Sequence, residues 1–456
     1  MKTRTETDSL GALEVPRDAL YGAQTQRAIN NFAISGRAMP PAFVRALVML
    51  KAAAAKANLA LGQLDEDVAR AIVASCERLL ADPALLEHFP VDVFQTGSGT
   101  SSNMNANEVI ATLASRELGK LVSPNDHVNC GQSSNDVVPT VIHLSAAVGL
   151  QERLLPALRQ LRQTIEAKAV QVDRHVKTGR THLMDAMPLT MGQALSGWSA
   201  QVEANERNLR GVQDALQALA QGGTAVGTGV NAHPDFAATV CRELSQETGL
   251  QFEPAGSFFA HIGSQDTAVA LSGQLKAFAV TLMKISNDLR WMNSGPLAGL
   301  GEISLEPLQP GSSIMPGKVN PVIPEATAMV AAQVIGNDAA VTIGGQAGNF
   351  ELNVMLPVIA DNVLESIELL SNAASLLASR AIATFTVNED NLAHSLRRNP
   401  ILVTALNPII GYMKAAEIAK RAYQQGRAVV DVAAELTDIP RDELETLLDP
   451  NKLTGA

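Results

Sequence analysis

The chain has 456 residues, of which 46% are hydrophobic, 18% charged and only 4% aromatic, and its formal net charge is -11 at pH 7. This acidic balance argues against nucleic acid or an anionic membrane surface as a partner. The length suggests two or three domains with a large core. The shortage of aromatic side chains favours helices packed through Ala, Leu and Val, so we expect a mainly α fold.

Cysteine usage and the amino terminus indicate where the protein works. Three cysteines at wide spacing, Cys76, Cys130 and Cys241, form neither a disulfide framework nor a metal-ligand pattern. The segment MKTRTETDSLGALEV lacks the apolar core of a signal peptide, and no run of about 18 uninterrupted apolar residues occurs in the chain. We therefore expect a soluble, cytoplasmic protein without a membrane segment.

Residues 1–137 are expected to form a first domain of short helices. Apolar residues recur at helical spacing from Ala42 to Leu61. The segment Thr96 to Val109, TGSGTSSNMNANEV, offers a dense set of hydroxyls, and we expect a helix to begin near its Asn107. Free amides and hydroxyls at a helix start suit a carboxylate, although ordinary helix capping explains the same residues.

Residues 138–387 are expected to form a central domain of long helices. Five helical patterns run over Asp136–Val176, Pro188–Ala220, Ser264–Ser294, Pro321–Gly344 and Pro357–Phe385. Each is about twice the typical helix of roughly 11 to 12 residues, or longer, and such helices need packing along their sides, so we expect an elongated bundle. Pro156 should kink the first helix. Proline is tolerated near helix starts, where Pro139, Pro188 and Pro321 lie.

The fourth of these patterns carries small apolar side chains on more than one side. They are Ala328, Ala331, Ala332, Val334, Ile335, Ala339 and Ala340. A helix of a monomeric bundle needs only a single apolar stripe. The wider apolar surface therefore predicts that the chain associates with copies of itself.

Residues 388–456 are expected to form a small helical domain. A polar break from Val387 to Asp390 separates this domain from the last long helix. The stretch ILVTALNPIIGYMKAAEIAKRAYQQG is typical of a helix pair, and ELTDIPRDELETLLDP is typical of a short helix with Pro440 at its start.

The stretch Gly311 to Pro321, GSSIMPGKVNP, lies among five prolines and is therefore expected to be an irregular loop. Its two glycines permit backbone angles with which successive amides can point at one anion. Its polar side chains belong to Ser312, Ser313, Lys318 and Asn320. The lysine supplies positive charge, the asparagine directional hydrogen bonds, and either serine a hydroxyl that becomes a base if its alkoxide is stabilised. The loop thus suits a carboxylate, whereas a surface loop rich in turn formers is the alternative.

A polar segment from Gly179 to Thr190, GRTHLMDAMPLT, lies between the first two long helical patterns. Its His182 is the best general acid or base among the eight histidines, because donors flank it at a helix junction. For a lone histidine, a hydrogen-bonded structural role is nevertheless the more common one.

No cofactor is expected, because neither a metal-ligand set nor a nucleotide motif is apparent. The segment Gly222 to Asn231, GGTAVGTGVN, lacks the Gly-Lys-Ser/Thr of a phosphate loop. Its glycines are instead expected to form a tight turn near a substrate.

Five segments in chain order carry a resemblance to a known family. They are TGSGTSSNMNANEV, SSNDVVPT, GRTHLMDAMPLT, GGTAVGTGVN and GSSIMPGKVNP. Together with DSLGALEVPRDALYGAQTQRA near the start and LVTALNPIIGYMKAAEIAK near the end, they resemble the fumarase/aspartase superfamily over essentially the whole chain. The resemblance implies a mainly α, three-domain fold with a central bundle of long helices. It also implies a homotetramer whose active sites are each assembled from three subunits.

The resemblance also assigns roles to individual residues. His182 coincides with the catalytic histidine of fumarases, and Glu325 with the glutamate that pairs with it, where a carboxylate favours the protonated ring. A charge at a helix amino terminus is the alternative role for Glu325. Ser312 is expected to be the catalytic base. The expected substrate-binding residues are Ser98, Gly99, Thr100, Ser133, Ser134, Asn135, Thr181, Ser313, Lys318, Val319 and Asn320.

Three departures from the family pattern concern a second site and the choice of substrate. The segment Ser123, Pro124, Asn125, Asp126 stands where fumarases commonly have a histidine-containing secondary anion site, which puts that site in doubt. Phe259 replaces a glutamate that the family often has. The segment from Pro321 to Glu325 resembles the version found in aspartases.

The resemblance implies reversible anti addition of water to fumarate, giving L-malate, so a small dicarboxylate is the expected substrate. Starting from malate, Ser312 would take a proton beside one carboxylate, and Lys318 with the loop amides would stabilise the extra charge. His182 would help the hydroxyl to leave as water. Ammonia-lyases of the aspartase type commonly have glutamine at that position, so His182 favours hydration. The aspartase-like segment from Pro321 to Glu325 keeps an ammonia-lyase as the alternative. A non-catalytic structural homologue is a third reading, against which the polar residues argue.

Overall fold

The structure is a computed structural model, and it describes residues 2–455. Helices dominate these residues, and the strands among them occur only in two-stranded pairs. The chain packs into two compact units. Unit 1 holds the chain up to Pro156, Glu206–Ala279 and Ala332–Ser371, and unit 2 holds the rest. The predicted mainly α fold is confirmed, and the three predicted domains stay a prediction.

Unit 1 begins with a hairpin that the sequence analysis did not predict. β1 (Thr3–Asp8) pairs antiparallel with β2 (Gly11–Pro16), and residues on both strands alternate in exposure. β1 has no apolar residue, so it lacks the alternation that predicts a strand. β2 does alternate, but only through Leu13 and Val15, which is too short a pattern to identify it. The next element is α1 (Ala23–Asn31).

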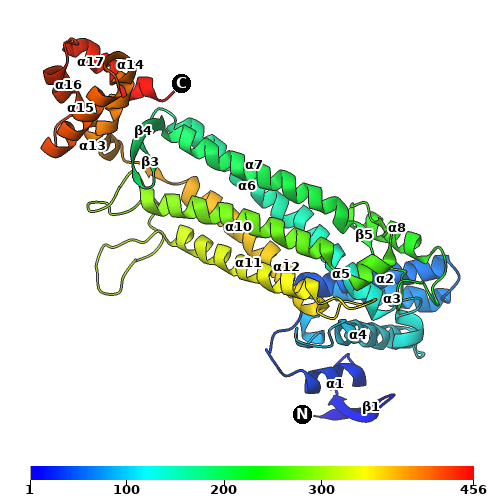
Figure 1. The fold of residues 1–456 in the computed structure, drawn as a ribbon. Coiled ribbons are helices and arrows are strands. Elements are labelled where there is room, and N and C mark those ends of the chain that lie inside the picture. Colours follow the sequence, from blue (N-terminus) through cyan, green and yellow to red (C-terminus); the bar gives the residue numbers. More distant parts are fainter. Residues whose placement is uncertain (1, 456) are drawn as a thin grey trace. The chain divides into compact units, whose positions relative to one another are not determined.

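Three helices of unit 1 pack against one another, namely α2 (Pro41–Ala60), α3 (Glu66–Ala81) and α4 (Thr100–Leu118) (Figure 1). α2 agrees with the helix predicted from Ala42 to Leu61. The prediction that a helix begins near Asn107 is wrong, because α4 begins at Thr100. Gly99 lies just before it with a φ of 71°, and its carbonyl accepts the first helical hydrogen bond, from the Asn103 N–H at 3.0 Å. Thr100, Ser101 and Ser102 therefore lie in the first turn of the helix, while Thr96 and Ser98 precede it.

The first long helical pattern forms two helices rather than one. α5 (Ser134–Gly149) and α6 (Leu155–Val172) are separated by a π-helical turn, η3 (Leu150–Leu154). This turn ends two residues before Pro156, which has no N–H to donate to the preceding turn. The proline that was expected to kink the helix therefore coincides with a change in its hydrogen-bond pattern.

The other four long patterns correspond to α7 (Met191–Leu216), α10 (Asp266–Met292), α11 (Val322–Gln346) and α12 (Leu356–Leu377), and each helix contributes one segment to each unit. Pro188 lies close to the start of α7, as predicted, but it precedes the helix and belongs to a strand. The strand is β4 (Met184–Thr190), which pairs antiparallel with β3 (Val176–Thr181). A two-stranded pair consists only of edge strands, where proline is tolerated.

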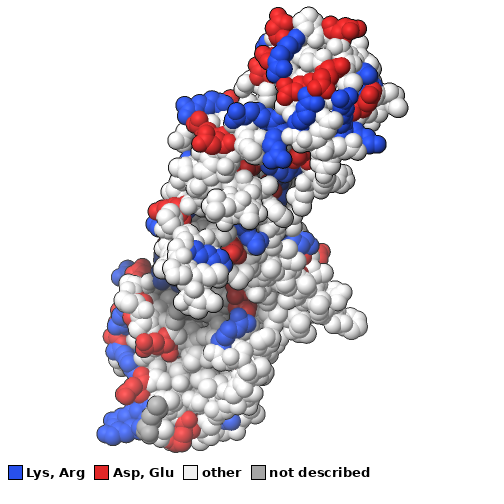
Figure 2. Space-filling model, turned by 90° about the vertical axis from the view of Figure 1, so that its left-hand side faces the viewer, with Lys and Arg blue, Asp and Glu red and all other residues white. Residues whose placement is uncertain are grey.

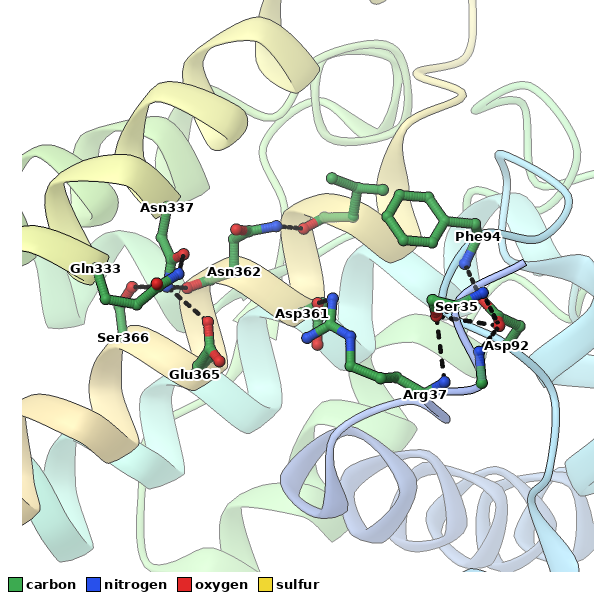
Figure 3. Close-up of polar contacts among 12 residues, drawn as sticks. Ser35, Arg37, Asp92, Phe94, Gln333, Asn337, Asp361, Asn362, Glu365 and Ser366 are labelled. Carbon is green, nitrogen blue, oxygen red and sulfur yellow. Dashed lines mark hydrogen bonds and ion pairs between the residues drawn. The ribbon is translucent and has the colours of Figure 1, made fainter. Parts of the chain in front are cut away.

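Polar side chains join α11 to α12 within unit 1 (Figure 3). Asn337 of α11 donates from Nδ2 to Glu365 Oε2 at 2.8 Å and to Ser366 Oγ at 3.1 Å on α12. One turn earlier on α12, Asp361 forms an ion pair of 3.1 Å with Arg37. Burial raises the pKa of Asp361, and the guanidinium opposes that shift. These contacts fix α12 beside the segment that leads into α2.

α10 and α11 meet the length and hydropathy of a membrane-spanning helix. Within the most apolar windows, 50% of α10 and 33% of α11 is buried in the chain. On α11, Met329, Ile335 and Ile343 are large exposed apolar side chains. Core helices of soluble proteins pass the same test, so these two helices are weak support for a membrane protein. The broad apolar surface predicted for the fourth pattern is present.

The carboxyl-terminal helices of unit 2 have an apolar core of their own. The elements are α13 (Glu389–Arg398), η5 (Pro400–Leu406), α14 (Asn407–Ile410), α15 (Tyr412–Gln425), α16 (Val429–Leu436) and α17 (Arg441–Leu447) (Figure 1). Leu406, Ile418, Val432 and Leu444 are fully buried in this core. The predicted short helix begins directly after Pro440, whereas α16 was not predicted.

Charged side chains of both signs are interspersed on the face that Figure 2 shows, with wide uncharged areas between them. No large region of that face carries Lys and Arg alone. This distribution agrees with a composition of 46 acidic against 35 basic residues. It gives a polyanion no extended basic surface on that face.

Candidate active site

The hydroxyl-rich segment before α4 lies in unit 1 and packs against the start of α12. The Gly97 carbonyl accepts a hydrogen bond from the Leu356 N–H at 3.0 Å. A Cβ on Gly97 would lie only 1.9 Å from the carbonyl oxygen of Val354. Only glycine therefore permits this close approach of two backbones.

The three residues after Gly97 are predicted to bind the substrate, namely Ser98, Gly99 and Thr100. The hydroxyls of Ser98 and Thr100 lie 2.9 Å apart and share a hydrogen bond. Gly99 has a positive φ, and a Cβ there would also lie 2.8 Å from the Val138 side chain. The two hydroxyls are thus held at the amino terminus of α4, where the first N–H groups have no partner within the helix. One of them, that of Ser102, donates to Gln95 Oε1 at 2.9 Å.

Ser133, Ser134 and Asn135 form the start of α5 in the same unit. Ser133 closes a capping box: its N–H donates to Asp136 Oδ1 at 2.9 Å, and its Oγ accepts from the Asn135 N–H at 3.3 Å. Asn135 Nδ2 donates to the carbonyl of Ala225 at 2.8 Å. Capping, the alternative explanation for this segment, therefore applies to Ser133, while Ser134 has a different partner.

Asp136 joins the start of α5 to the glycine-rich turn. Its Oδ2 accepts from the N–H groups of Gly222 at 3.0 Å and Thr224 at 2.9 Å. Burial raises the pKa of this carboxyl to about 6, and the hydrogen bonds from backbone N–H groups oppose the shift. The turn contains Gly222, Gly227 and Gly229 at positive φ, as its predicted tightness requires.

A pocket of about 580 Å³ in unit 1 is lined by the start of α5 and by the glycine-rich turn. Amide and hydroxyl side chains dominate its wall, among them those of Asn103, Asn129, Gln132, Ser133 and Ser134. No lysine or arginine belongs to this lining. An anion bound here would therefore depend on neutral donors and on charge beneath the surface.

The doubtful secondary anion site borders the same pocket through Asn125 and Asp126. Ser123 donates from Oγ to Asp126 Oδ2 at 2.8 Å and accepts from the Asp126 N–H at 3.0 Å. Pro124 begins the short turn η2 (Pro124–Val128) between them. The polar groups of this segment thus bind one another, and Asp126 brings negative charge.

The predicted loop Gly311 to Pro321 lies in unit 2 and is closed at its neck. The Gly311 N–H donates to the Lys318 carbonyl at 2.7 Å, and Asn320 Nδ2 donates to the Gly311 carbonyl at 2.9 Å. A Cβ on Gly311 would lie 2.6 Å from the Lys318 carbonyl oxygen. The irregular loop is confirmed, and glycine at its neck is a steric requirement.

Ser312 lies at the inner edge of this loop. Its Oγ accepts from the N–H groups of Ile314 at 3.2 Å and Met315 at 3.1 Å. Two amides aimed at one hydroxyl oxygen stabilise negative charge on it. The side chains of Ser313 and Lys318 are exposed.

Lys318, Asn320 and Glu325 line one pocket of about 520 Å³ in unit 2. Val319 lines it as well, together with Arg290 and Asn293 at the end of α10. Neither of these last two residues was predicted, because polar residues at the end of a helical pattern carry no signal of their own. Glu325 lies in the first turn of α11, where its alternative role as a charge at a helix amino terminus also applies.

His182 occupies the tip of the β3–β4 hairpin in unit 2, next to Thr181 at the end of β3. The loop has two residues, His182 and Leu183, with φ values of 56° and 61°. Two positive φ angles define the turn that matches the twist of a tight hairpin, yet glycine or asparagine normally occupies these positions. The turn holds the exposed imidazole at some cost in backbone strain, which is typical of functional residues.

A buried ion cluster supports this hairpin. Lys177 Nζ donates to Glu302 Oε2 at 2.6 Å, and both side chains are at least nine-tenths buried. Arg180 Nη2 lies 2.8 Å from Glu302 Oε1, an ion pair without the alignment of a hydrogen bond. The carboxylate of Glu302 thus joins two cations of β3, one of them two residues before His182.

In the single chain, the predicted catalytic residues are not joined to one another. Among residues 2–455, no hydrogen bond or ion pair links His182 to Glu325 or to Ser312. Their joint action therefore stays a prediction. No group of three or more His, Cys, Asp or Glu side chains in the described part of the chain could hold a metal ion.

Two family models match the chain, that of a lyase family over residues 11–336 and that of the fumarase C carboxyl terminus over residues 402–455. The chain belongs to this lyase family and is an enzyme of the lyase class. The resemblance deduced from the five sequence segments is thereby confirmed.

Relatives within the family carry a more specific name. A protein of Pseudomonas aeruginosa named "Fumarate hydratase class II 2" is 69% identical over 453 residues, which cover 99% of both chains. The crystal structure of a class II fumarase from Schistosoma mansoni has a TM-score of 0.96 at 36% identity, over 99% of both chains. A "fumarate lyase:delta crystallin" from Brucella melitensis bound to cobalt has a TM-score of 0.94 at 43% identity, over 99% of this chain and 100% of that one.

Proposed function

We propose that the chain is a class II fumarate hydratase, which adds water to fumarate in the anti sense to give L-malate and catalyses the reverse reaction. The observation that carries this proposal is the 69% identity, over 99% of both chains, to the relative named "Fumarate hydratase class II 2". The TM-score of 0.96 to a class II fumarase supports it. His182 supports hydration over ammonia release, as argued above.

In the direction from malate, Ser312 acts as the base. Its alkoxide, held by the N–H groups of Ile314 and Met315, takes the proton from the carbon beside one carboxylate. The electron pair of that C–H bond moves onto the carboxylate, whose extra negative charge is stabilised by Lys318, Asn320 and the loop amides. The pair then returns to form the double bond as the hydroxyl leaves. His182, supported by Glu325, gives that hydroxyl a proton, and water is released.

The remaining predicted residues bind the substrate through hydroxyls, amides and backbone N–H groups. They are Ser98, Gly99, Thr100, Ser133, Ser134, Asn135, Thr181, Ser313 and Val319. We infer a cytoplasmic homotetramer in which different copies contribute these groups to each site. The exposed apolar side chains of α11 support self-association.

One alternative is an ammonia-lyase, which the aspartase-like segment from Pro321 to Glu325 favours. A spectrophotometric assay separates the two. Purified protein should interconvert malate and fumarate without ammonium. Formation of aspartate from fumarate and ammonium, with malate left untouched, would establish the alternative. A chain inactive on both would be a non-catalytic homologue.

The role of Ser312 is tested by Ser312→Ala. Loss of a general base lowers kcat by about 10² to 10⁴-fold, while assembly and malate binding stay near those of the wild type. Ser379→Ala is the matched control, since the exposed Ser379 hydroxyl bonds only to its own helix, at the Ser375 carbonyl. A Ser312→Ala enzyme with wild-type kcat would remove Ser312 as the base.

A further inference from the structure

Lys51 of α2 is a completely buried lysine beneath the pocket of unit 1. Its Nζ donates to Asn129 Oδ1 and to Gln132 Oε1, each at 3.0 Å, and both of these residues line the pocket. A buried ammonium is costly unless polar groups compensate for its lost hydration. The position of this cation therefore calls for an explanation that packing alone does not provide.

The ammonium sets the direction of the hydrogen bonds around it, because it has only hydrogens to offer. Asn129 must turn its amide oxygen towards Lys51. Asn103 and Asn107 then approach that same oxygen with their Nδ2 groups, each at 3.2 Å. As a consequence, the amide oxygens of Asn103 and Asn107 are buried without a donor among the described residues. Two unsatisfied acceptors are the cost of this orientation.

The orientation of the Asn103 amide determines that Ser134 accepts a hydrogen bond from it. The Nδ2 group of Asn103 also donates to Ser134 Oγ, at 3.0 Å. The serine oxygen is thus an acceptor on its buried side. Its own hydrogen finds no acceptor in the part of the chain that the structure describes. That hydrogen is left for a group in the pocket, which Ser134 lines.

We propose that Lys51 is a positioning residue for a substrate carboxylate bound at Ser134. Acting through Asn129 and Asn103, the ammonium makes the serine present a hydrogen, rather than a lone pair, to the anion. The inference rests on the proposed function, which supplies a dicarboxylate. It assigns to Lys51 a part in binding although the lysine does not touch the substrate.

The charge of Lys51 responds to pH near neutrality. Burial lowers its pKa to about 7, while the negative charge of Asp136 on α5 opposes the shift. The thiol of Cys76 stays neutral, because burial raises its pKa to about 12. As the pH rises through about 7, Lys51 loses a proton, becomes able to accept a hydrogen bond, and no longer dictates the direction of the others.

A double-mutant cycle tests the proposal. Lys51→Met and Ser134→Ala should each raise KM for malate by roughly tenfold or more, with a smaller effect on kcat, because each removes a hydrogen bond to a charged group. The double variant should be no worse than either single one, since both act through the same bond. If the increases in KM of the two single variants multiply in the double variant, the proposal is overturned. An unchanged KM for Lys51→Met would also overturn it. Lys56→Met, on the same helix but outside this network, is the control and should keep the wild-type KM.

The pH profile separates positioning from a general loss of structure. KM of the wild type should rise as the pH passes upward through about 7, and this rise should be absent from Ser134→Ala. If KM depends on pH in the same way in the wild type and in Ser134→Ala, the proposal is refuted, even where Lys51→Met fails to fold. If the wild type proves to be an ammonia-lyase, the proposed function fails, and the same variants are compared with aspartate, which also carries carboxylates.

Discussion

Glutamine in place of Glu302 should weaken the hairpin that carries His182. The substitution keeps the size of the side chain and removes its negative charge. Lys177 and Arg180 would then share a buried site without a counter-ion. Glutamine can accept only some of the hydrogen bonds that the two cations donate, and it cannot neutralise their charge.

The magnitude follows from the distances. At contacts of 2.6 Å and 2.8 Å, each pair has a Coulomb attraction of about 6 kcal/mol at an effective dielectric constant of about 20. Most of this attraction offsets the desolvation of the three charges. Removing one partner of a buried pair typically costs about 3 to 5 kcal/mol. Because 17% of the Arg180 side chain is exposed and screened, we expect a loss of about 3 kcal/mol.

Urea unfolding at a fixed protein concentration measures this loss, and malate turnover reports on the hairpin. Glu302→Gln should show both the loss in free energy of unfolding and a lower kcat, because the turn that presents His182 loses its support. Glu306→Gln is the control: Glu306 lies 4.0 Å from Arg380 on the surface, so its charge contributes at most about 0.5 kcal/mol. If the two variants unfold within about 1 kcal/mol of each other, the cluster does not stabilise the hairpin as argued.

Two further predictions concern unit 1. Burial, reinforced by the nearby His261, lowers the pKa of His143 to about 4, so between about pH 6.5 and pH 4 the unfolded chain binds more protons and stability is lost as the pH falls. Between pH 7 and pH 4, His143→Gln should lose up to about 3 kcal/mol less of its free energy of unfolding than the wild type does, as measured by urea unfolding. If the free energy of unfolding falls equally with pH in both proteins, the prediction is contradicted. Gly97→Ala places a Cβ 1.9 Å from a backbone oxygen and should destabilise by about 3 kcal/mol or more. Gly211→Ala, with nothing within 4 Å in the helix α7, should instead stabilise by about 0.5 to 1 kcal/mol, and equal thermal midpoints for the two would refute the steric argument.

The long helices and the irregular loop were predictable because local physics determines them. Apolar-rich patterns of more than 20 residues are too long for a strand, and α10, α11 and α12 lie close to their predicted ranges. Proline likewise excluded a helix from Gly311 to Pro321. The helix start at Thr100 was not predictable, since the residues on both sides of the boundary are small and polar.

The candidate site was predictable only in part. The motifs located Ser312, Lys318 and Asn320 on one loop, and hydrogen bonds between Gly311, Lys318 and Asn320 close it. They gave no indication of Arg290, which shares a pocket with Lys318. Nor did they indicate the role of Lys51, because in the sequence it is one lysine within an alanine-rich helix.

The sequence by itself determined the family, the mainly α fold and the identity of the polar residues in the five segments, because these depend on residue type and short-range spacing. Only the tertiary structure decided that Pro188 lies in a strand, that His182 sits in a strained turn, and that Lys51 lies beneath the pocket floor. These features depend on contacts between residues far apart in the chain. Burial and hydrogen-bond direction arise from such contacts, and no local pattern encodes them.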